Sequence, residues 1–251
     1  MGKIVVLGSA NAVPNAEHEN THLLAVSGDR SVLIDCSSNP IQHLRRAGVA
    51  FEQLTDLILT HFHPDHVSGV PLLLMDLWLM GRTTPLEIYG LAYTLDRTQA
   101  MMELFGWQNW PDFYPVHFHR VEESELAQVL VTDEMRILAS PVKHLIPTIG
   151  LRIEFIKVDK VVTYSCDTEP CPQVVRLAQD ANVLIHEATG EQVGHSSPAQ
   201  AAGIAKQAGA QALYLIHYSP EADGEELVAQ ARDGFQGPVR LAHDFMVLEY
   251  N

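Results

Sequence analysis

The sequence has few cysteines and no long apolar run. Its three cysteines, Cys36, Cys166 and Cys171, are odd in number and form no Cys-x-x-Cys pair. That pattern argues against a disulfide framework and favours a reducing, cytoplasmic setting. The most apolar stretch, residues 67–80, has 14 residues and includes Asp76, so it is too short for a membrane span. The N-terminal apolar run is too brief for a signal-peptide core, and no membrane association is expected.

Basic residues are also scarce. The chain has 16 Lys and Arg against 31 Asp and Glu, which gives a formal charge of −15. A surface of that charge repels polyanions, so extensive contacts with nucleic-acid phosphates are disfavoured. Bound metal cations would offset the charge locally. No linker, low-complexity tract or internal repeat divides the chain, and we expect a single domain over residues 1–251.

Short runs rich in Val, Ile and Leu alternate with helical segments along the chain. Two strand-rich blocks, each flanked by helices, predict two packed sheets with helices outside, an α/β (α+β) architecture. The first block comprises strands at residues 3–8, 22–28, 31–36 and 54–60, with helices near 40–47, 67–80 and 91–105. The second block spans 116–164 and is followed by helices at 172–179, 198–207 and 225–232, interleaved with strands.

The segment "LTHFHPDHVSG", residues 59–69, places three histidines and an aspartate within six positions after an apolar run. Pro64 keeps the preceding residue out of the helical region, so the chain should stay extended up to it. The period of two along a strand then turns His61 and His63 to the same side. Asp65 and His66 face another direction as a helix begins. The motif therefore predicts one cation between the first two histidines and a second beside it.

Further ligands are expected where other apolar strands end. His144, Asp167 and His217 each directly follow such a strand. Taken alone, each could be a capping Asp or a hydrogen-bonded interior His. Their recurrence at strand ends favours a shared metal site.

Five motifs in chain order resemble those of metallo-β-lactamase-fold hydrolases: "LIDCS", "THFHPDHVSG", "PVKH", "YSCDTEPC" and "LIHYSP". The strings "HEAT" at residues 186–189 and "GHSSPAQAA" from Gly194 resemble signatures of the ribonuclease Z branch. The resemblance covers nearly the whole chain. It implies a four-layer αββα sandwich with the active site along one edge of the two sheets.

The resemblance also implies a ligand set for two divalent ions. Zinc suits nitrogen and carboxylate ligands without thiolate, with manganese and iron as alternatives. Asp35 is expected to accept a hydrogen bond from a ligand histidine, although a structural Asp at a strand end is the alternative. One ion would be held by His61, His63 and His144, the other by Asp65, His66 and His217, with Asp167 bridging them.

The same resemblance suggests the catalytic groups. A hydroxide between two ions could attack a phosphodiester in line. His195 is the candidate proton donor to the leaving group, Glu187 would orient it, and Asp65 could assist as a base while ligating. His186 is as consistent with buried packing as with catalysis. His117 and His119, an H-x-H without the following D-H, are interpreted as ordinary strand positions.

Two departures from the family pattern bear on the substrate. Only 23 positions separate His144 from Asp167, which leaves no room for the protruding arm that grips transfer RNA. Ser37 and Ser38 also stand where glycine is usual. With the acidic charge, these departures favour a phosphodiesterase for a small diester or nucleotide over a tRNA 3′-end endonuclease. Thioester or lactone hydrolysis and a non-hydrolytic di-metal protein are further alternatives. The apolar helix at 67–80 could form a homodimer surface or be buried in the core.

Overall fold

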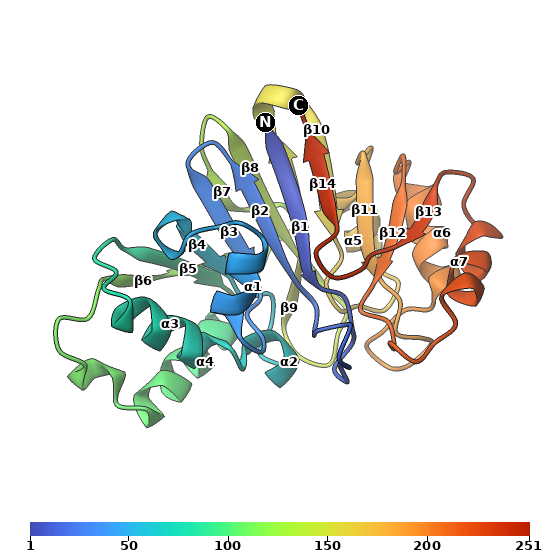
Figure 1. Cartoon of the computed structure of the whole chain (residues 1–251). Coiled ribbons are helices and arrows are strands. Elements are labelled where there is room, and N and C mark those ends of the chain that lie inside the picture. The colour runs from blue at the N-terminus through green and yellow to red at the C-terminus, as the bar shows by residue number, and fades with distance from the viewer.

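Two seven-stranded sheets pack face to face, and helices cover their outer faces (Figure 1). The computed structural model describes all 251 residues. The first sheet has the order β14-β1-β2-β3-β4-β5-β6 and the second β13-β12-β11-β10-β9-β8-β7. The strands of the first sheet are β1 (Gly2–Gly8), β2 (His22–Ser27), β3 (Arg30–Ile34), β4 (Asp56–Ile58), β5 (Leu86–Gly90), β6 (Val116–Arg120) and β14 (Val247–Tyr250). Those of the second are β7 (Ala127–Val131), β8 (Met135–Val142), β9 (Thr148–Phe155), β10 (Lys160–Tyr164), β11 (Val183–Glu187), β12 (Leu213–Ile216) and β13 (Val239–Leu241).

Helices form the two outer layers, which confirms the predicted four-layer αββα sandwich. No helix has both the length and the apolar character needed to cross a membrane. Beside the first sheet lie α1 (Pro40–Arg46), α2 (Pro64–Val67), α3 (Val70–Leu79) and α4 (Ala92–Leu104), and beside the second α5 (Pro172–Leu177), α6 (Pro198–Ala208) and α7 (Gly224–Arg232). Three short 3₁₀ segments complete the chain: η1 (Phe51–Gln53), η2 (Trp107–Asn109) and η3 (Ile156–Val158).

The central strands are buried on both faces, which explains their continuous apolar runs. In β1, Ile4 and Val6 pack between the sheets, whereas Val5 and Leu7 pack under the helices of the first outer layer. The cluster between the sheets comprises 27 buried residues drawn from both sheets. Because this shared core joins the two halves of the chain, we propose that residues 1–251 are one domain.

The order of strands along the chain does not match the order within the sheets. The sequence places residues 116–120 in the second strand-rich block, yet β6 pairs in parallel with β5 of the first sheet. The last strand, β14, pairs antiparallel with β1 of the first sheet instead of continuing the second. Hydrophobic patterning predicts that a strand exists, but backbone pairing partners are chosen only when the sheets assemble.

The helix expected over residues 67–80 is interrupted. α2 ends at Val67 and α3 begins at Val70, with Gly69 as the residue before α3. The Gly69 amide donates to the Cys36 carbonyl oxygen at 2.8 Å, and a Cβ at Gly69 would lie 2.8 Å from the Ser37 carbonyl oxygen. Only glycine permits this approach. The break therefore packs the segment after the H-x-H-x-D-H motif directly against the end of β3.

Candidate metal centre

The predicted ligands lie on one edge of the sandwich, in the segments that follow the carboxyl ends of four strands. His61 and His63 follow β4 and are succeeded by the short helix α2, seen at the lower edge of Figure 1. His144, Asp167 and His217 follow β8, β10 and β12 of the second sheet. The two packed sheets thus bring residues up to 156 positions apart in the sequence to one site.

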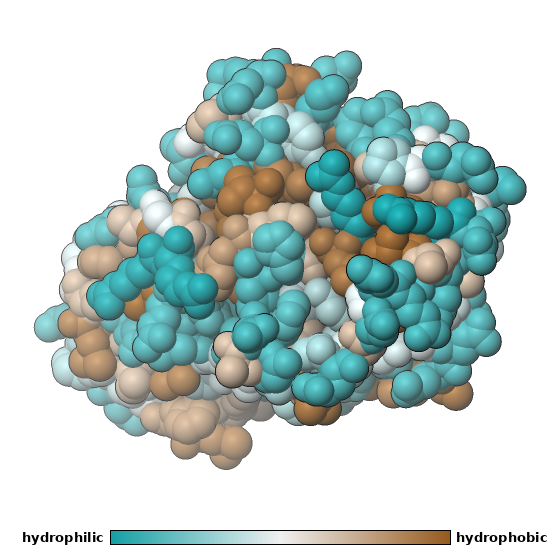
Figure 2. All heavy atoms as spheres, turned by 45° about the vertical axis from the view of Figure 1, so that its right-hand side comes forward, coloured by the Kyte–Doolittle hydropathy of each residue, from teal (hydrophilic) through white to brown (hydrophobic).

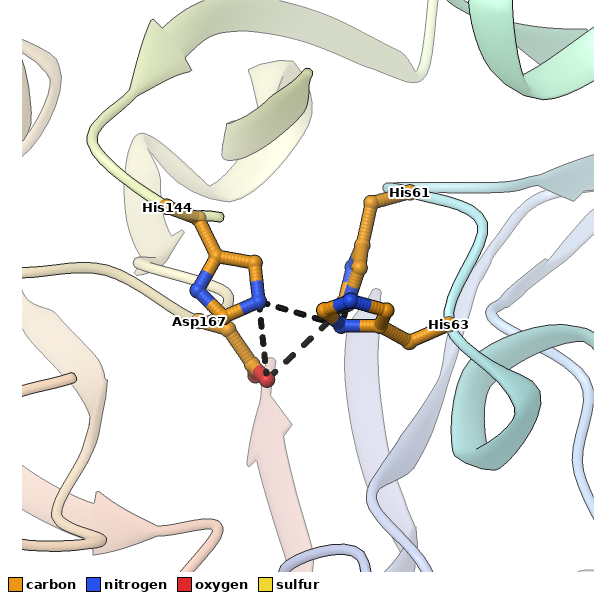
Figure 3. Close-up of side chains that lie close together, drawn as sticks. All are labelled: His61, His63, His144 and Asp167. Atoms are coloured by element: carbon orange, nitrogen blue, oxygen red, sulfur yellow. Dashed lines mark hydrogen bonds and ion pairs between the residues drawn. The ribbon is translucent and has the colours of Figure 1, made fainter. Parts of the chain in front are cut away.

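Three histidines and one aspartate converge on a single point (Figure 3). The Nδ1 atom of His63 lies 3.1 Å from the Nε2 atoms of both His61 and His144. Asp167 Oδ2 is 3.9 Å from each of those Nε2 atoms. Ligand nitrogens around one tetrahedral zinc, at about 2.0–2.1 Å from the metal, are roughly 3.3 Å apart. The spacing of this group therefore fits one ion.

A second group lies beside the first and shares Asp167 with it. The Nε2 atoms of His66 and His217 are each 3.5 Å from Asp65 Oδ2, and 3.6 and 3.4 Å from Asp167 Oδ2. Asp167 Oδ2 consequently lies within 3.9 Å of four imidazole nitrogens. The carboxylate of Asp167 therefore belongs to both groups of potential ligands.

Unpartnered buried atoms support the fit to metal ions. The Nε2 atoms of His66 and His217 and the Oδ1 atom of Asp167 are buried without a hydrogen-bond partner. Such atoms are costly unless something binds them. Burial also lowers the pKa of His61, His63 and His144, which favours the neutral imidazoles that bind metals.

Hydrogen bonds at the Nδ1 atoms orient three of the candidate ligand rings. His66 Nδ1 donates to Asp35 Oδ2 at 2.7 Å, and Asp35 also accepts from the amide and hydroxyl of Thr60. His144 Nδ1 donates to the Gly194 carbonyl oxygen at 2.7 Å. The Nδ1 atom of His217 lies 2.9 Å from the hydroxyl of Thr189, which donates to the His217 carbonyl oxygen. In each case the Nδ1 contact leaves Nε2 free to face the centre.

The backbone is strained around the site. Asp35, Cys166 and His217 have φ values of +62°, +54° and +54°, in the left-handed region that non-glycine residues seldom adopt. Such strain persists only where the surroundings enforce it and often marks functional sites. Cys166 Sγ lies 3.5 Å from His61 Nδ1, but burial raises the pKa of its thiol well above the usual value. We therefore do not interpret it as a thiolate ligand.

His195 and Glu187 form a pair next to the metal ligands. Glu187 is fully buried, and its Oε1 lies 3.1 Å from His195 Nδ1 while also accepting from the Ser196 and Thr168 amides. The His195 ring stacks on His217 with centroids 5.7 Å apart. Burial alone would lower the pKa of His195, but the hydrogen bond and charge of Glu187 outweigh it and raise the pKa. Glu187 thus orients His195 and favours its protonated form.

The other predicted residues lie outside the ligand clusters. His186 is fully buried on β11, and its Nδ1 donates to the Glu187 carbonyl oxygen at 2.8 Å. Since it is buried within the sheet and its ring contacts a main-chain carbonyl oxygen, we interpret it as a packing residue. His117 and His119 lie in β6, as the sequence predicts, but both contact Glu87.

A cleft of about 420 Å³ opens beside the ligands. It contains no lysine or arginine. Asn11 and Val13, from the loop between β1 and β2, form one wall, and Gln192, from the loop before His195, contributes another part. The full lining is Asn11, Ala12, Val13, His63, Pro64, Asp65, Asp167, Thr189, Gln192, His195 and His217.

Sequence reasoning expected the contact of Asp35 with a ligand histidine but missed the other residues that orient the candidate ligands. Thr60 and Thr189 lie within the quoted strings "THFHPDHVSG" and "HEAT", and this position is the signal that could have drawn attention to them. Gly194 opens a quoted motif, but its role depends on a carbonyl oxygen and on the absence of a side chain. Neither property is visible in a sequence pattern.

The sequence matches the model of a known protein family, described as "Anti-Pycsar protein Apyc1", over residues 2–243. The chain belongs to this Apyc1 family. It is also 30% identical to a ribonuclease Z of Mycobacterium sp. (strain KMS), with 99% of this chain and 96% of the relative covered. These relationships confirm the predicted ribonuclease Z-like branch of the metallo-β-lactamase-fold superfamily.

Solved structures agree with this assignment for the Apyc1-family chain. The metallo-β-lactamase-fold protein YhfI from Bacillus subtilis is 25% identical, with a TM-score of 0.82 and 98% of both chains covered. A diphosphatase of the PhnP family shares the fold at a TM-score of 0.78 and 18% identity, covering 100% of this chain and 98% of the other. The chain is therefore a metal-dependent hydrolase of this fold, with residue clusters able to bind divalent metal ions.

Proposed function

We propose that the protein is a dinuclear phosphodiesterase that hydrolyses a small phosphodiester or nucleotide. The observation that carries the proposal is the position of Asp167 Oδ2, within 3.9 Å of four ligand nitrogens from both sheets. One ligand group alone would support a single ion. Two groups that share a carboxylate support a pair of ions.

We propose zinc as the metal, since all ligands are imidazoles and carboxylates without thiolate. Bound ions would activate water and neutralise the charge that develops on a phosphoryl group. His61, His63 and His144 would hold one ion and Asp65, His66 and His217 the other. Asp167 would contact both ions, and Asp35 would fix the orientation of the His66 ring.

His195 is the proposed proton donor. Its Nδ1 faces Glu187, so its Nε2 is available to the cleft, where it can protonate the oxygen of the departing alcohol. Glu187 is held by three backbone amides besides this contact, from Thr168, Thr189 and Ser196. It can therefore fix the ring without moving. Asp65 Oδ2, beside both His66 and His217, is the proposed proton acceptor.

The dimensions and charge of the cleft support a small substrate. A volume of about 420 Å³ suits a nucleotide-sized molecule, and the lining offers no lysine or arginine to a nucleic-acid backbone. Between His144 and Asp167 the chain forms only β9, η3 and β10. There is thus no projecting arm at this position. The competing function, cleavage of precursor tRNA, is favoured by the similarity to ribonuclease Z over 99% of this chain.

The proposal can be tested by comparing leaving groups. Diesters with an alkoxide leaving group, including cyclic nucleotides, need a proton donor, whereas p-nitrophenolate departs without one. We expect His195→Ala to lose about 10²- to 10⁴-fold in kcat on the alkoxide esters and roughly 10-fold or less on bis-p-nitrophenyl phosphate. His63→Ala should lose both activities, and the exposed His243→Ala is the control. A lactone, a thioester and precursor tRNA complete the panel.

The results separate the alternatives clearly. Turnover of small diesters with intact precursor tRNA supports the proposal. Efficient and specific tRNA cleavage would replace it with the ribonuclease Z function. If no diester is hydrolysed but the lactone or thioester is, the phosphodiesterase assignment is wrong while the metal centre stands.

We also propose that two copies of the chain associate through the α3–α4 face, as the family resemblance implies. Leu72 and Leu79 on α3 are 43% and 65% exposed, and Leu104 and Phe105 at the end of α4 are 88% and 59% exposed. Trp78, also on α3, stacks on Trp110 of the segment after α4, with centroids 5.1 Å apart. Figure 2 shows hydrophobic atoms at the lower end of the molecule, the end that carries the segment after α4 in Figure 1.

A further inference from the structure

A second cluster of potential ligands lies on the edge of the first sheet, outside the cleft. β6 is the terminal strand of that sheet, and His117 and His119 alternate with Phe118 along it. The period of two places both histidines on one face. Glu87, on the neighbouring strand β5, is directly opposite His117 in the parallel register. Three ligand-type side chains thus project from two paired strands.

The carboxylate of Glu87 contacts both imidazoles. Its Oε1 lies 3.0 Å from His117 Nδ1, and its Oε2 lies 2.5 Å from His119 Nε2. The side chains of His117 and His119 are 53% and 45% exposed, and that of Glu87 is 24% exposed. Solvent therefore reaches the histidines, while their strands hold the Cα positions.

The surroundings restrain one of the two rings. Tyr89, the register partner of His119, stacks on it with centroids 4.7 Å apart and planes at 21°. A stacked neighbour limits rotation of the imidazole and keeps its Nε2 directed at Glu87. The His117 ring stands at 84° to His119, with centroids 6.5 Å apart. Side-chain rotation would therefore have to bring the two imidazoles closer before their nitrogens could face a common point.

We propose that Glu87, His117 and His119 form a separate binding site for a divalent transition-metal ion, with zinc as the preferred ion. Two imidazoles and one carboxylate are a common donor set for such ions. The ion would take the place of the protons now shared between the carboxylate and the two rings. Water would fill the remaining coordination positions, since this face of the edge strand is open to solvent.

The expected affinity is lower than that of the buried clusters. The ring centroids of His61, His63 and His144 are 4.8–5.1 Å apart, compared with 6.5 Å for His117 and His119. The centroids of the two exposed rings must therefore approach each other by about 1.5 Å on binding, a motion that side-chain rotation allows. Zinc should occupy this site only after the buried ligands are saturated.

Metal stoichiometry at a series of buffered free zinc concentrations tests the site. We expect the wild-type protein to bind one ion more per chain than His119→Ala at saturation, and Glu87→Gln to weaken that last step about 10-fold or more. His63→Ala should retain the extra ion while losing ions from the cleft. The exposed His243→Ala is the matched control for removal of a surface histidine. Phosphodiester turnover should be unchanged in His119→Ala.

Anomalous scattering from zinc-soaked crystals of the wild-type protein provides the second measurement. A peak bounded by Glu87, His117 and His119 supports the proposal even if a variant folds poorly. Equal stoichiometry in wild type and His119→Ala overturns it, as does anomalous density confined to the cleft. Both measurements are independent of the substrate proposed for the cleft.

Discussion

The ring of His144 and the carbonyl oxygen of Gly194 are joined by a 2.7 Å hydrogen bond. This contact links a metal-ligand candidate to the residue directly before His195. The Gly194 amide is held in turn by Glu169 Oε1 at 3.0 Å, and Glu169 is paired with Lys143, the neighbour of His144. One backbone segment therefore positions both a ligand and the proposed proton donor.

Gly194→Ala should disturb that link. Gly194 has φ +86°, and a Cβ there would lie 2.9 Å from His144 Nδ1. The ring must shift, so we expect about a 10- to 100-fold loss of metal affinity, measured by competition with a chromophoric chelator. Gly81→Ala is a matched control because Gly81 has φ +81° and no atom within 4 Å of its Cβ position. An equal loss in both variants would show that backbone strain, not contact with His144, is responsible.

Asp167→Asn should remove the shared ligand. The substitution leaves an amide where a carboxylate faces four imidazoles, so we expect the number of tightly bound ions per chain to fall from two to one or none. Elemental analysis after gel filtration measures this directly. Retention of two ions with unchanged affinity would contradict a bridging role.

Metal removal should lower the thermal stability. An ion that binds only the folded protein stabilises it by about 2.7 kcal/mol when present at 100 times its dissociation constant. We expect the melting temperature to fall in excess chelator and to recover when zinc is added back. His63→Ala, which lacks a ligand, should respond less than the wild type. A melting temperature insensitive to chelator would indicate that the clusters do not hold tightly bound ions.

The buried Asp56 gives a pH-dependent prediction away from the metal centre. Burial raises the pKa of Asp56 above its ordinary value of 3.8, although Thr55 and Arg30 act in the opposite direction. The pKa of Asp56 is therefore higher in the folded than in the unfolded protein. Its favourable contribution to the free energy of unfolding is complete below pH 3.8 and is lost as the pH rises through the folded-state pKa.

Asp56→Asn cannot ionise and should not show that loss. As the pH rises from 4 to 7, the free energy of unfolding of the variant should therefore increase relative to that of the wild type. Urea denaturation of the two proteins, both in chelator, measures the difference. The control is Asp96→Asn at an exposed carboxylate paired with Arg120. The prediction is wrong if Asp56→Asn loses stability relative to the wild type as the pH rises.

The α3–α4 face should determine the oligomeric state. Leu79→Asp places a charge on a side chain that is 65% exposed in one copy, and burying that charge in a dimer is costly. Light scattering should show a dimeric wild type and a monomeric variant. Val131→Asp, at an apolar side chain 56% exposed on β7, is the control that should remain dimeric. A monomeric wild type at micromolar concentration would contradict the proposed surface.

The H-x-H-x-D-H segment could be interpreted from the sequence because its geometry is local. His61 and His63 share a side through the period of a strand, and Pro64 sets the point where the direction changes, as α2 begins there. The more distant ligands, including His144 and His217, could be proposed because strand ends are recognisable and because the family motifs recur in order. The structure brings all seven proposed ligands together.

The sequence by itself determined the alternation of strands and helices, the position of the principal motif and the acidic charge, because these depend on neighbouring residues and on composition. Only the tertiary structure decided that β6 and β14 join the first sheet, that Gly194 orients His144, and that Glu87 lies between His117 and His119. Those relationships depend on backbone pairing and on carbonyl and side-chain directions between distant segments. They arise only when the two sheets pack around their common core.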